Sequence, residues 1–236
     1  MRTDPRGGHN RKTFNKDFFK AWTPKMAYVL GYIYSDGTIE DVRKSSRTCY
    51  LAITSIDYDI LSKIRETLSS NHNLYINKQH ITIFPGNRKY LCKQSYTLRI
   101  GSKSLFDDLV KLGLTPRKSL TLKFPKIPIK LLKYFVRGYF DGDGCVMVSI
   151  AKGRKMSSIT TTFTCGNSMF LEDLSYLLNR FTTSRIKNIF NNTHAYQLNY
   201  RKYDSLKILD FIYSNLSKAP FLARKYNIYE TYKTGL

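Results

Sequence analysis

The stretch Tyr28-Val-Leu-Gly-Tyr-Ile-Tyr-Ser-Asp36-Gly37 recurs later in the chain as Phe135-Val-Arg-Gly-Tyr-Phe-Asp-Gly-Asp143-Gly144. Each copy is an apolar run that ends in a carboxylate followed by a glycine. The copies align residue for residue from Gly31 and from Gly138, at an offset of 107 in a chain of 236 residues. An internal repeat of this length predicts a fold made of two copies of one unit.

Both copies have the features of a helix that ends at its final glycine. Thr23 can cap the first helix, and Pro24 suits its first position. We expect Gly37 and Gly144 to adopt the left-handed conformation that commonly ends a helix.

Small residues recur at a four-residue spacing in both copies: Gly31 with Ser35, and Gly138 with Gly142. Residues four apart share one face of a helix. A glycine inside a helix costs roughly 1 kcal/mol relative to alanine. We therefore expect these four residues to lie where the two helices approach closely.

The carboxylates Asp36 and Asp143 become neighbours if the two helices pack with their C-terminal ends side by side. Each would lie at the unfavourable end of a helix dipole, and the two would repel each other. A divalent cation would relieve both penalties, and oxygen ligands with room for water and phosphate suit Mg²⁺. Carboxylates that hold metal are a recurrent apparatus for phosphodiester hydrolysis.

The two stretches resemble the LAGLIDADG motif, and the chain resembles the single-chain homing endonucleases that carry two such motifs. The resemblance extends from about residue 24 to the C-terminus. It implies that the last acidic residue of each motif, here Asp36 and Asp143, binds the catalytic metal. The earlier acidic position is Asp141 in the second copy and Tyr34 in the first, but that position is not the metal ligand in the family.

The resemblance also implies a fold and an activity. The fold would be α+β, with two pseudo-symmetric αββαββα half-domains, the motif helices packed at the centre and antiparallel sheets forming a DNA-binding saddle. The activity would be site-specific cleavage of a long duplex, one phosphodiester on each strand across the minor groove, leaving 3′ overhangs. The expected cofactor is Mg²⁺, with Mn²⁺ substituting for it and Ca²⁺ binding without supporting cleavage.

Composition agrees with a polyanionic partner. The chain has 39 Lys and Arg against 17 Asp and Glu, a net charge of +22, and the basic residues are spread along its length. The four cysteines form no C-x-x-C pair, which favours reduced thiols in an intracellular protein. We find no apolar run of membrane-spanning length and no secretory signal, and we expect a monomer without an obligate protein partner.

The chain divides into a basic N-terminal arm (1–22), a first half (23–113), a proline-containing linker (114–128) and a second half with a C-terminal helix (129–236). The arm is interpreted equally well as a DNA contact or as a disordered tail. Hydrophobic periodicity predicts strands at 38–43, 48–54, 74–77, 81–84, 95–100, 146–151, 159–164, 185–190 and 196–200. It predicts helices after the first motif at 57–69, 103–112, 129–141, 167–181, 204–215 and 221–231, with a basic loop at 86–89.

One face of each predicted sheet carries Thr, Arg, Lys, Gln and Asn, the residue types that contact base edges and phosphates. The two halves differ in these residues, so the target should be only weakly palindromic. Each basic residue taken singly is explained equally well as a solvated surface charge or as a DNA contact. The predicted DNA-binding set is Arg43, Arg47, Tyr50, Arg88, Lys89, Thr97, Arg99, Lys152, Arg154, Arg185, Gln197, Asn199 and Arg201.

Cleavage also requires stabilisation of charge on the phosphate. The family has a basic residue near each active site, at the end of the last strand of each half. We predict Lys103 and Lys202 in this catalytic role, with Arg99 and Arg201 as rivals.

Other functions fit the same scaffold. The basic sheets could bind intron RNA in a maturase that assists splicing, or bind DNA in a regulator that has lost cleavage. The two glycine-containing helices could also belong to an ordinary core, although a core alone does not require an acid before both final glycines.

Overall fold

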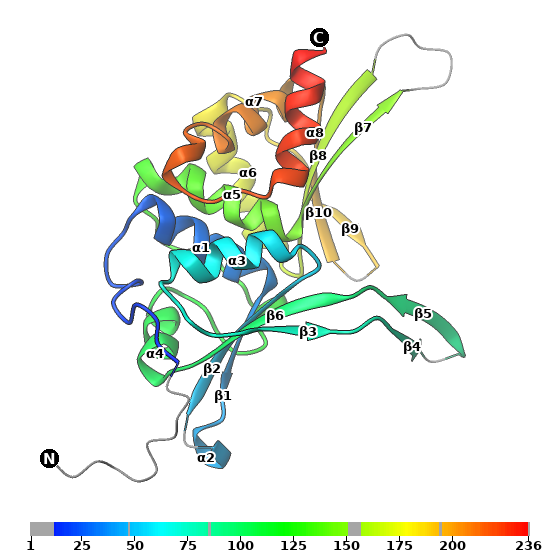
Figure 1. Ribbon diagram of the computed structural model, residues 1–236. Helices are drawn as coiled ribbons and strands as arrows, with labels where there is room; N and C mark the ends of the chain where they lie inside the picture. The colour runs from blue at the N-terminus through cyan, green and yellow to red at the C-terminus, as the bar shows by residue number, and fades with distance from the viewer. Residues whose placement is uncertain (1–11, 47, 85, 151–156, 194, 236) are drawn as a thin grey trace, which may run out of the picture.

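The computed structural model describes residues 12–46, 48–84, 86–150, 157–193 and 195–235. Its centre is a pair of helices, α1 (Pro24–Asp36) and α5 (Leu132–Asp143), which lie side by side in Figure 1. The hydroxyl of Thr23 accepts a hydrogen bond from the Met26 amide at 3.0 Å, which caps α1 as predicted. Both helices are buried along most of their length, so they form the core that the two halves share.

Glycines allow these two helices to touch backbone to backbone. A Cβ atom on Gly31 would lie 2.0 Å from the carbonyl oxygen of Phe135, and one on Gly138 would lie 2.0 Å from the carbonyl oxygen of Tyr28. Neither obstacle is a flexible side chain that could move aside. Glycine is therefore required at both crossing points, because any larger residue would push the helices apart.

The final glycines of the motifs do not adopt the predicted left-handed conformation. Gly37 has φ −89° and ψ 147°, and Gly144 has φ −82° and ψ 159°, so each already begins a strand. Glycine is needed here for space: a Cβ would lie 2.6 Å from the Ile33 carbonyl oxygen in the first copy and 2.1 Å from the Phe140 ring in the second. The chain thus passes from helix to strand without a turn residue.

The first half contains an antiparallel sheet with helices on one face. The strand order is β1-β2-β6-β3. These strands are β1 (Gly37–Asp41), β2 (Cys49–Ser55), β3 (Leu74–Asn77) and β6 (Ser95–Gly101). The helices of this half are the short α2 (Arg43–Ser46), α3 (Tyr58–Thr67) and α4 (Lys103–Lys111). The first predicted strand therefore ends earlier than expected, since Arg43 begins α2.

The second half repeats this arrangement with strand order β7-β8-β10-β9, also antiparallel. Its strands are β7 (Gly144–Ile150), β8 (Ser157–Cys165), β9 (Phe190–Asn192) and β10 (Ala195–Arg201). Its helices are α6 (Ser168–Thr182), α7 (Lys202–Ile212) and α8 (Ala223–Thr234). The α+β fold of two pseudo-symmetric halves around the motif helices is thus confirmed (Figure 1).

One strand prediction and one loop prediction were wrong. The strand expected from Arg185 begins only at Phe190, because side chains take up backbone N–H groups before it: Lys187 donates to Ser175 Oγ at 3.2 Å. The expected loop at 86–89 instead turns into β5 (Arg88–Cys92), which pairs with β4 (His80–Phe84). This β4–β5 hairpin projects from the first sheet in Figure 1.

A buried charged network anchors the segment that leads into α8. Arg137 is fully buried and donates to the carbonyl oxygens of Ile212 (2.6 Å) and Ser214 (2.7 Å). Asp141 is also buried and accepts hydrogen bonds from the Tyr28 hydroxyl and the Leu222 amide, both at 2.8 Å. The earlier acidic position of the second motif therefore has structural partners.

The connecting segments are short or irregular. Residues 12–22 pack on the first half: Phe19 is buried, and the Asn15 amide donates to the Leu68 carbonyl at 2.9 Å. The remainder of the predicted arm, residues 1–11, lies outside the described residues. Within the described ranges, 3₁₀ turns occur at Lys118–Leu120, Ile129–Leu131 and Leu216–Lys218. Among the described residues, no helix is long and apolar enough to cross a membrane.

Candidate functional site

Asp36 and Asp143 are the last residues of α1 and α5, the two central helices. The helices remain in close contact at these ends: a Cβ on Gly142 would lie 1.9 Å from the Ser35 hydroxyl and 3.3 Å from the carboxyl carbon of Asp36. The two motif carboxylates therefore occupy one locality, from which β1 and β7 diverge into the two sheets.

The electrostatics of this locality disfavour two negative charges. Desolvation raises the pKa of Asp36 to about 6, and the negative charge of Asp143 adds to the shift. The Tyr32 hydroxyl, as a hydrogen-bond donor, acts in the opposite direction. Desolvation also raises the pKa of Asp143, while the positive charges of Lys118 and Lys225 lower it. Two carboxylates that resist ionisation together form a site that a cation would stabilise.

Lys118, in the linker, lies beside the carboxylates. Its ammonium group donates to the Ser35 carbonyl oxygen at 2.7 Å. It also lines a cavity of about 250 Å³ together with Asp143 and Thr164. Burial lowers the pKa of Lys118, whereas the charges of Asp143 and Asp36 raise it. This lysine can therefore place a positive charge at the mouth of the site.

Lys225, in the first turn of α8, is the counterpart of Lys118. Its buried ammonium group donates to the carbonyl oxygens of Phe140 (2.7 Å), Asp141 (2.8 Å) and Gly142 (3.2 Å) at the end of α5. Burial lowers the pKa of Lys225 to about 8, although the nearby carboxylates oppose the shift. A cation at this point offsets the negative end of the helix dipole beneath Asp143.

Lys103 and Lys202 lie elsewhere, contrary to the prediction. They open α4 and α7, just past the ends of β6 and β10. The strand registers put those ends level with Glu40 and Met147, each four residues beyond the motif carboxylate. Four strand residues span about 13 Å, so these two lysines are far from the carboxylates.

The two lysines that lie beside the motif helix ends share a spacing that is visible in the sequence. Arg117-Lys118 recurs as Arg224-Lys225 at an offset of 107, the same offset as that of the motifs. The sequence prediction instead used the last strand of each half, where the offset between the halves is not 107. Leu98 and Leu198, which pair equivalently in the two sheets, are 100 residues apart.

The polar face of the first sheet carries an organised set of side chains. The hydroxyl of Thr97 lies 2.9 Å from that of Thr54 and accepts a hydrogen bond from the Asn77 amide at 2.9 Å. The Arg99 guanidinium stacks 3.9 Å above the ring of Tyr50 and also approaches Glu40 at 3.5 Å. These side chains can offer donors and acceptors to base edges.

The polar face of the second sheet is hollowed. A groove of about 800 Å³ runs across β7, β8 and β10. Thr162 donates to Asn199 in it at 2.6 Å. The predicted residues Gln197, Asn199 and Arg201 all line this groove, so the sheet brings them together.

The other predicted DNA contacts are dispersed. Arg43 is held by Asp41 and approaches Asp107 at 3.8 Å. Lys89 is exposed on β5, and Arg185 is exposed outside any strand. Only the backbone of Arg88 is described, and Arg47, Lys152 and Arg154 lie outside the described residues.

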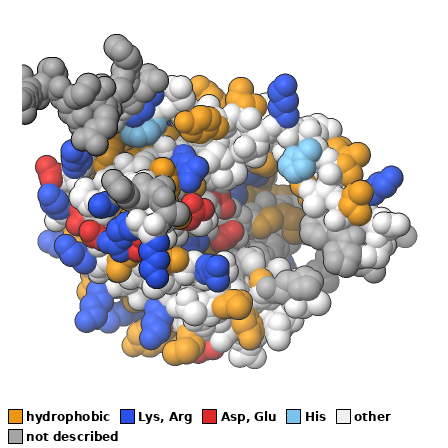
Figure 2. Space-filling model, turned by 90° about the horizontal axis from the view of Figure 1, so that it is seen from below, with side chains coloured by type: hydrophobic (Ala, Val, Ile, Leu, Met, Phe, Trp, Pro, Cys, Tyr) orange, Lys and Arg blue, Asp and Glu red, His pale blue; other side chains and the backbone are white. Residues whose placement is uncertain are grey.

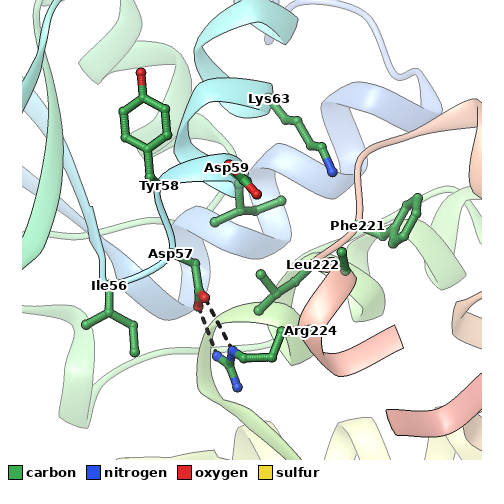
Figure 3. Close-up of a pocket in the computed structure, with 10 residues that line it drawn as sticks. Ile56, Asp57, Tyr58, Asp59, Lys63, Phe221, Leu222 and Arg224 are labelled. Carbon is green, nitrogen blue, oxygen red and sulfur yellow. Dashed lines mark hydrogen bonds and ion pairs between the residues drawn. The ribbon is translucent and has the colours of Figure 1, made fainter. Parts of the chain in front are cut away.

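An ion pair links the two halves next to the site (Figure 3). Arg224, which precedes Lys225, reaches Asp57 at the start of α3 with an N–O distance of 2.9 Å. The pair lies in a cavity of about 280 Å³ whose lining includes Tyr58 and Phe221. Residues from the end of the chain are thereby fixed against the first half.

Comparison with known proteins identifies the architecture. Residues 130–212 match the family model of the LAGLIDADG-like domain. The solved structure of the LAGLIDADG meganuclease I-AabMI bound to uncleaved DNA is similar at a TM-score of 0.54 and 17% identity, over 91% of this chain and 90% of that one. The homing endonuclease I-WcaI bound to its DNA recognition sequence gives a TM-score of 0.53 at 16% identity, over 89% and 91%.

A variant of I-DmoI in complex with its target DNA and in the presence of Mn is similar at a TM-score of 0.51 and 19% identity, over 86% of this chain and 97% of that one. No curated protein matches the sequence. Residues 130–212 are therefore similar to the LAGLIDADG-like domain, and the chain as a whole has the fold of the LAGLIDADG homing endonucleases.

Proposed function

We propose that this protein is a site-specific, divalent-metal-dependent DNA endonuclease that hydrolyses one phosphodiester on each strand of a duplex. The observation that carries the proposal is the joint position of Asp36 and Asp143, with a lysine beside each helix end, at the junction of two polar sheets. Such a site has the charges needed to bind a metal ion and to face a phosphate.

The carboxylates fit a Mg²⁺ site of the kind that relies partly on water and phosphate. Among the described residues, no group of three or more His, Cys, Asp or Glu could surround a metal. Mg²⁺ usually takes one or two protein carboxylates and completes its coordination with water and substrate phosphate. Asp36 and Asp143 would hold the metal, which would polarise the phosphate and activate water. We expect Mn²⁺ to replace Mg²⁺, and Ca²⁺ to bind without cleavage.

The lysines have separate roles in this proposal. Lys118, which lines the cavity beside Asp143, would offset charge that develops on the phosphate. Lys225 is occupied by backbone carbonyl groups, so it would act as a positioning residue that holds the end of α5, and with it Asp143, in place. Tyr32, hydrogen-bonded to Ser55 at 3.1 Å, would steady Asp36 in the first half.

Duplex DNA is the substrate that the surface favours. The net charge of +22 and the two polar sheets suit a long polyanion, and several relatives of the same fold were solved with DNA. One chain supplies both carboxylates, so a monomer would suffice to cut both strands, across the minor groove and with 3′ overhangs. Action on genomic DNA would require an intracellular location.

The test is cleavage of a randomised duplex library with Mg²⁺ and with chelator, followed by sequencing of the cut ends. Metal-dependent enrichment of one long, weakly palindromic site is expected. Asp36→Asn and Asp143→Asn should each abolish double-strand cleavage while specific DNA affinity persists. Unchanged cutting by both variants would refute the metal-site assignment.

A matched pair of variants tests the lysines. Lys118→Met should lower cleavage strongly, whereas Lys103→Met should leave it near the wild-type rate, because Lys103 lies at the far end of β6. The opposite pattern would restore the assignment made from the sequence. Specific binding without cutting would favour a silent DNA-binding protein, and binding of intron RNA alone would favour a maturase.

A further inference from the structure

The β4–β5 hairpin is a separate two-stranded sheet that keeps the pairing register of β3 and β6 in the first sheet. In the sheet, Asn77 of β3 pairs with Ser95 of β6. Three residues further along on each side, after two residues that belong to no strand (78–79 and 93–94), His80 of β4 pairs with Cys92 of β5. Because equal numbers of residues separate the two pairs, the alternation of faces carries through from the sheet into the hairpin.

This continuity decides which hairpin side chains lie on the polar face of the sheet. Thr97 and its partner Tyr75 lie on that face, since Leu98 beside them is fully buried on the other. Every second residue outward from Tyr75 and Thr97 lies on the same face. This places Ile81, which pairs with Leu91, and then Ile83, which pairs with Lys89, on the polar face. The face that is hydroxyl- and guanidinium-rich near the centre therefore becomes aliphatic at its outer end.

The aliphatic side chains are open to solvent. Ile81 is 59% exposed, Ile83 is 61% exposed and Leu91 is 53% exposed. Exposed apolar residues that cluster on one face of a strand pair commonly mark a contact surface. In Figure 2, the arm that projects on the right carries hydrophobic and basic side chains.

The charge around this aliphatic patch identifies its partner as a polyanion. No Asp or Glu occurs between Glu66 and Asp107. The same interval contains six basic residues, Lys78, Arg88, Lys89, Lys93, Arg99 and Lys103. An apolar protein partner would not require such a one-sided charge, whereas DNA presents phosphates at the groove edges and apolar thymine methyl groups within the major groove.

We propose that Ile81, Ile83 and Leu91 form a thymine-reading patch that contacts 5-methyl groups in the major groove, at the outer end of the target on the first-half side. This inference rests on the proposed function and adds a specificity element to it. A two-stranded ribbon fits the major groove, and aliphatic contact distinguishes thymine by its methyl group. Leu91 is six residues from Thr97, and six strand residues span about 20 Å. Along a duplex this distance corresponds to about six base-pair steps beyond the position that Thr97 faces.

The second half has no hairpin equivalent to β4–β5 in its described part. There β9 pairs with β10 directly across the turn, with Asn192 opposite Ala195, so the ribbon closes at once. In the first half, β3 ends at Asn77 and β6 begins only at Ser95, and the hairpin fills the interval. The target should therefore extend further on the first-half side, and its outer thymines should occur on that side.

The experiment compares thymine with deoxyuridine, which lacks only the methyl group. The Asp36→Asn variant binds the target selected from the randomised library, and outer thymines are replaced by deoxyuridine one at a time. Affinity should fall by about fourfold for each contacted methyl, the size expected for exposing one methyl-sized apolar group. Because the change is made in the DNA, the protein fold is unaffected.

A variant of the protein removes the same contact from the protein side of the complex. Ile81→Ser, Ile83→Ser and Leu91→Ser together remove the aliphatic surface and leave no methyl group that could contact thymine. This variant should bind thymine and deoxyuridine targets equally. Tyr90→Ser, on the opposite face of the hairpin and also exposed, should retain the full difference.

Each outcome either supports or overturns the proposed thymine contact. A deoxyuridine effect that disappears in the triple serine variant and persists in Tyr90→Ser supports the patch. Specific duplex binding with no deoxyuridine effect overturns the patch and leaves the proposed function intact. Absence of any specific duplex binding overturns both.

Discussion

Replacing Asp36 with Asn should stabilise the metal-free protein at neutral pH. The pKa of Asp36 rises from 3.8 to about 6 on folding, first through desolvation and then through the charge of Asp143. A shift of this size corresponds to at most about 3 kcal/mol of destabilisation of the ionised, folded protein at pH 7. Because the side chain is partly exposed, solvent screening reduces this figure, and we expect Asp36→Asn to add about 1–2 kcal/mol to the free energy of unfolding.

The sign of the pH dependence follows from linkage. Between pH 3.8 and about 6 the folded protein holds a proton on Asp36 that the unfolded chain has released. The stabilising contribution of this protonated carboxyl is complete below pH 3.8 and is lost as the pH rises through 6. The advantage of Asp36→Asn should therefore be close to zero at pH 4, grow between pH 4 and 6, and remain constant above.

Urea unfolding in chelator across this pH range measures the difference. Asp173→Asn, which removes an exposed carboxylate from α6, is the control and should change stability by less than about 0.5 kcal/mol at every pH. A lower stability of Asp36→Asn at pH 7, or a difference that does not vary with pH, would refute the electrostatic reasoning.

Addition of Mg²⁺ extends the same experiment. A cation that binds only the folded state stabilises it by mass action. The wild type should gain stability as Mg²⁺ is titrated, because the ion removes the repulsion between Asp36 and Asp143. The Asn variant should gain much less. Equal gains in both proteins would place the metal elsewhere.

Three further predictions concern the scaffold and are measured by urea unfolding at pH 7. Gly138→Ala should lower stability by about 2 kcal/mol or more despite its better helix propensity, because its Cβ would meet the Tyr28 carbonyl oxygen at 2.0 Å; an unchanged midpoint would contradict the close packing. Arg137→Met should lower the free energy of unfolding by about 3–5 kcal/mol, because it leaves buried carbonyl groups without a hydrogen-bond donor. A loss below about 1 kcal/mol would show that water replaces the guanidinium. A double-mutant cycle on Asp57 and Arg224 should give a coupling of at most about 1 kcal/mol, because the pair is partly exposed; a larger value would mean a stronger link between the halves.

The motif repeat was sufficient to predict the centre of the fold. Glycines inside two apolar helices pointed to close packing, and the structure has backbone atoms in contact at Gly31 and Gly138. The alternation of apolar and polar residues likewise predicted most strands and which face of each sheet is polar. These features depend on local pattern and on the repeat, both of which are visible in one sequence.

Features that depend on tertiary contacts were not predictable in the same way. Gly37 and Gly144 were assigned a left-handed conformation, but the surrounding side chains require small residues in an extended one. Strand β5 was interpreted as a loop because only pairing with β4, across a turn, reveals its length. The position of Lys225 depends on the path of the chain after α7, which Arg137 fixes through carbonyl groups.

The offset between the halves changes along the chain, and this separates constrained from variable regions. It is 107 at Asp36 and Asp143, 100 at Leu98 and Leu198, and 107 again at Lys118 and Lys225. Insertions therefore occur in the sheets and their loops, and they cancel before the chain returns to the centre. In the proposed function the central charges would satisfy the same chemistry in both halves, whereas each sheet would meet a different part of an asymmetric DNA target. The β4–β5 hairpin is the largest such difference among the described residues, which makes it the place where specificity beyond the shared scaffold is best sought.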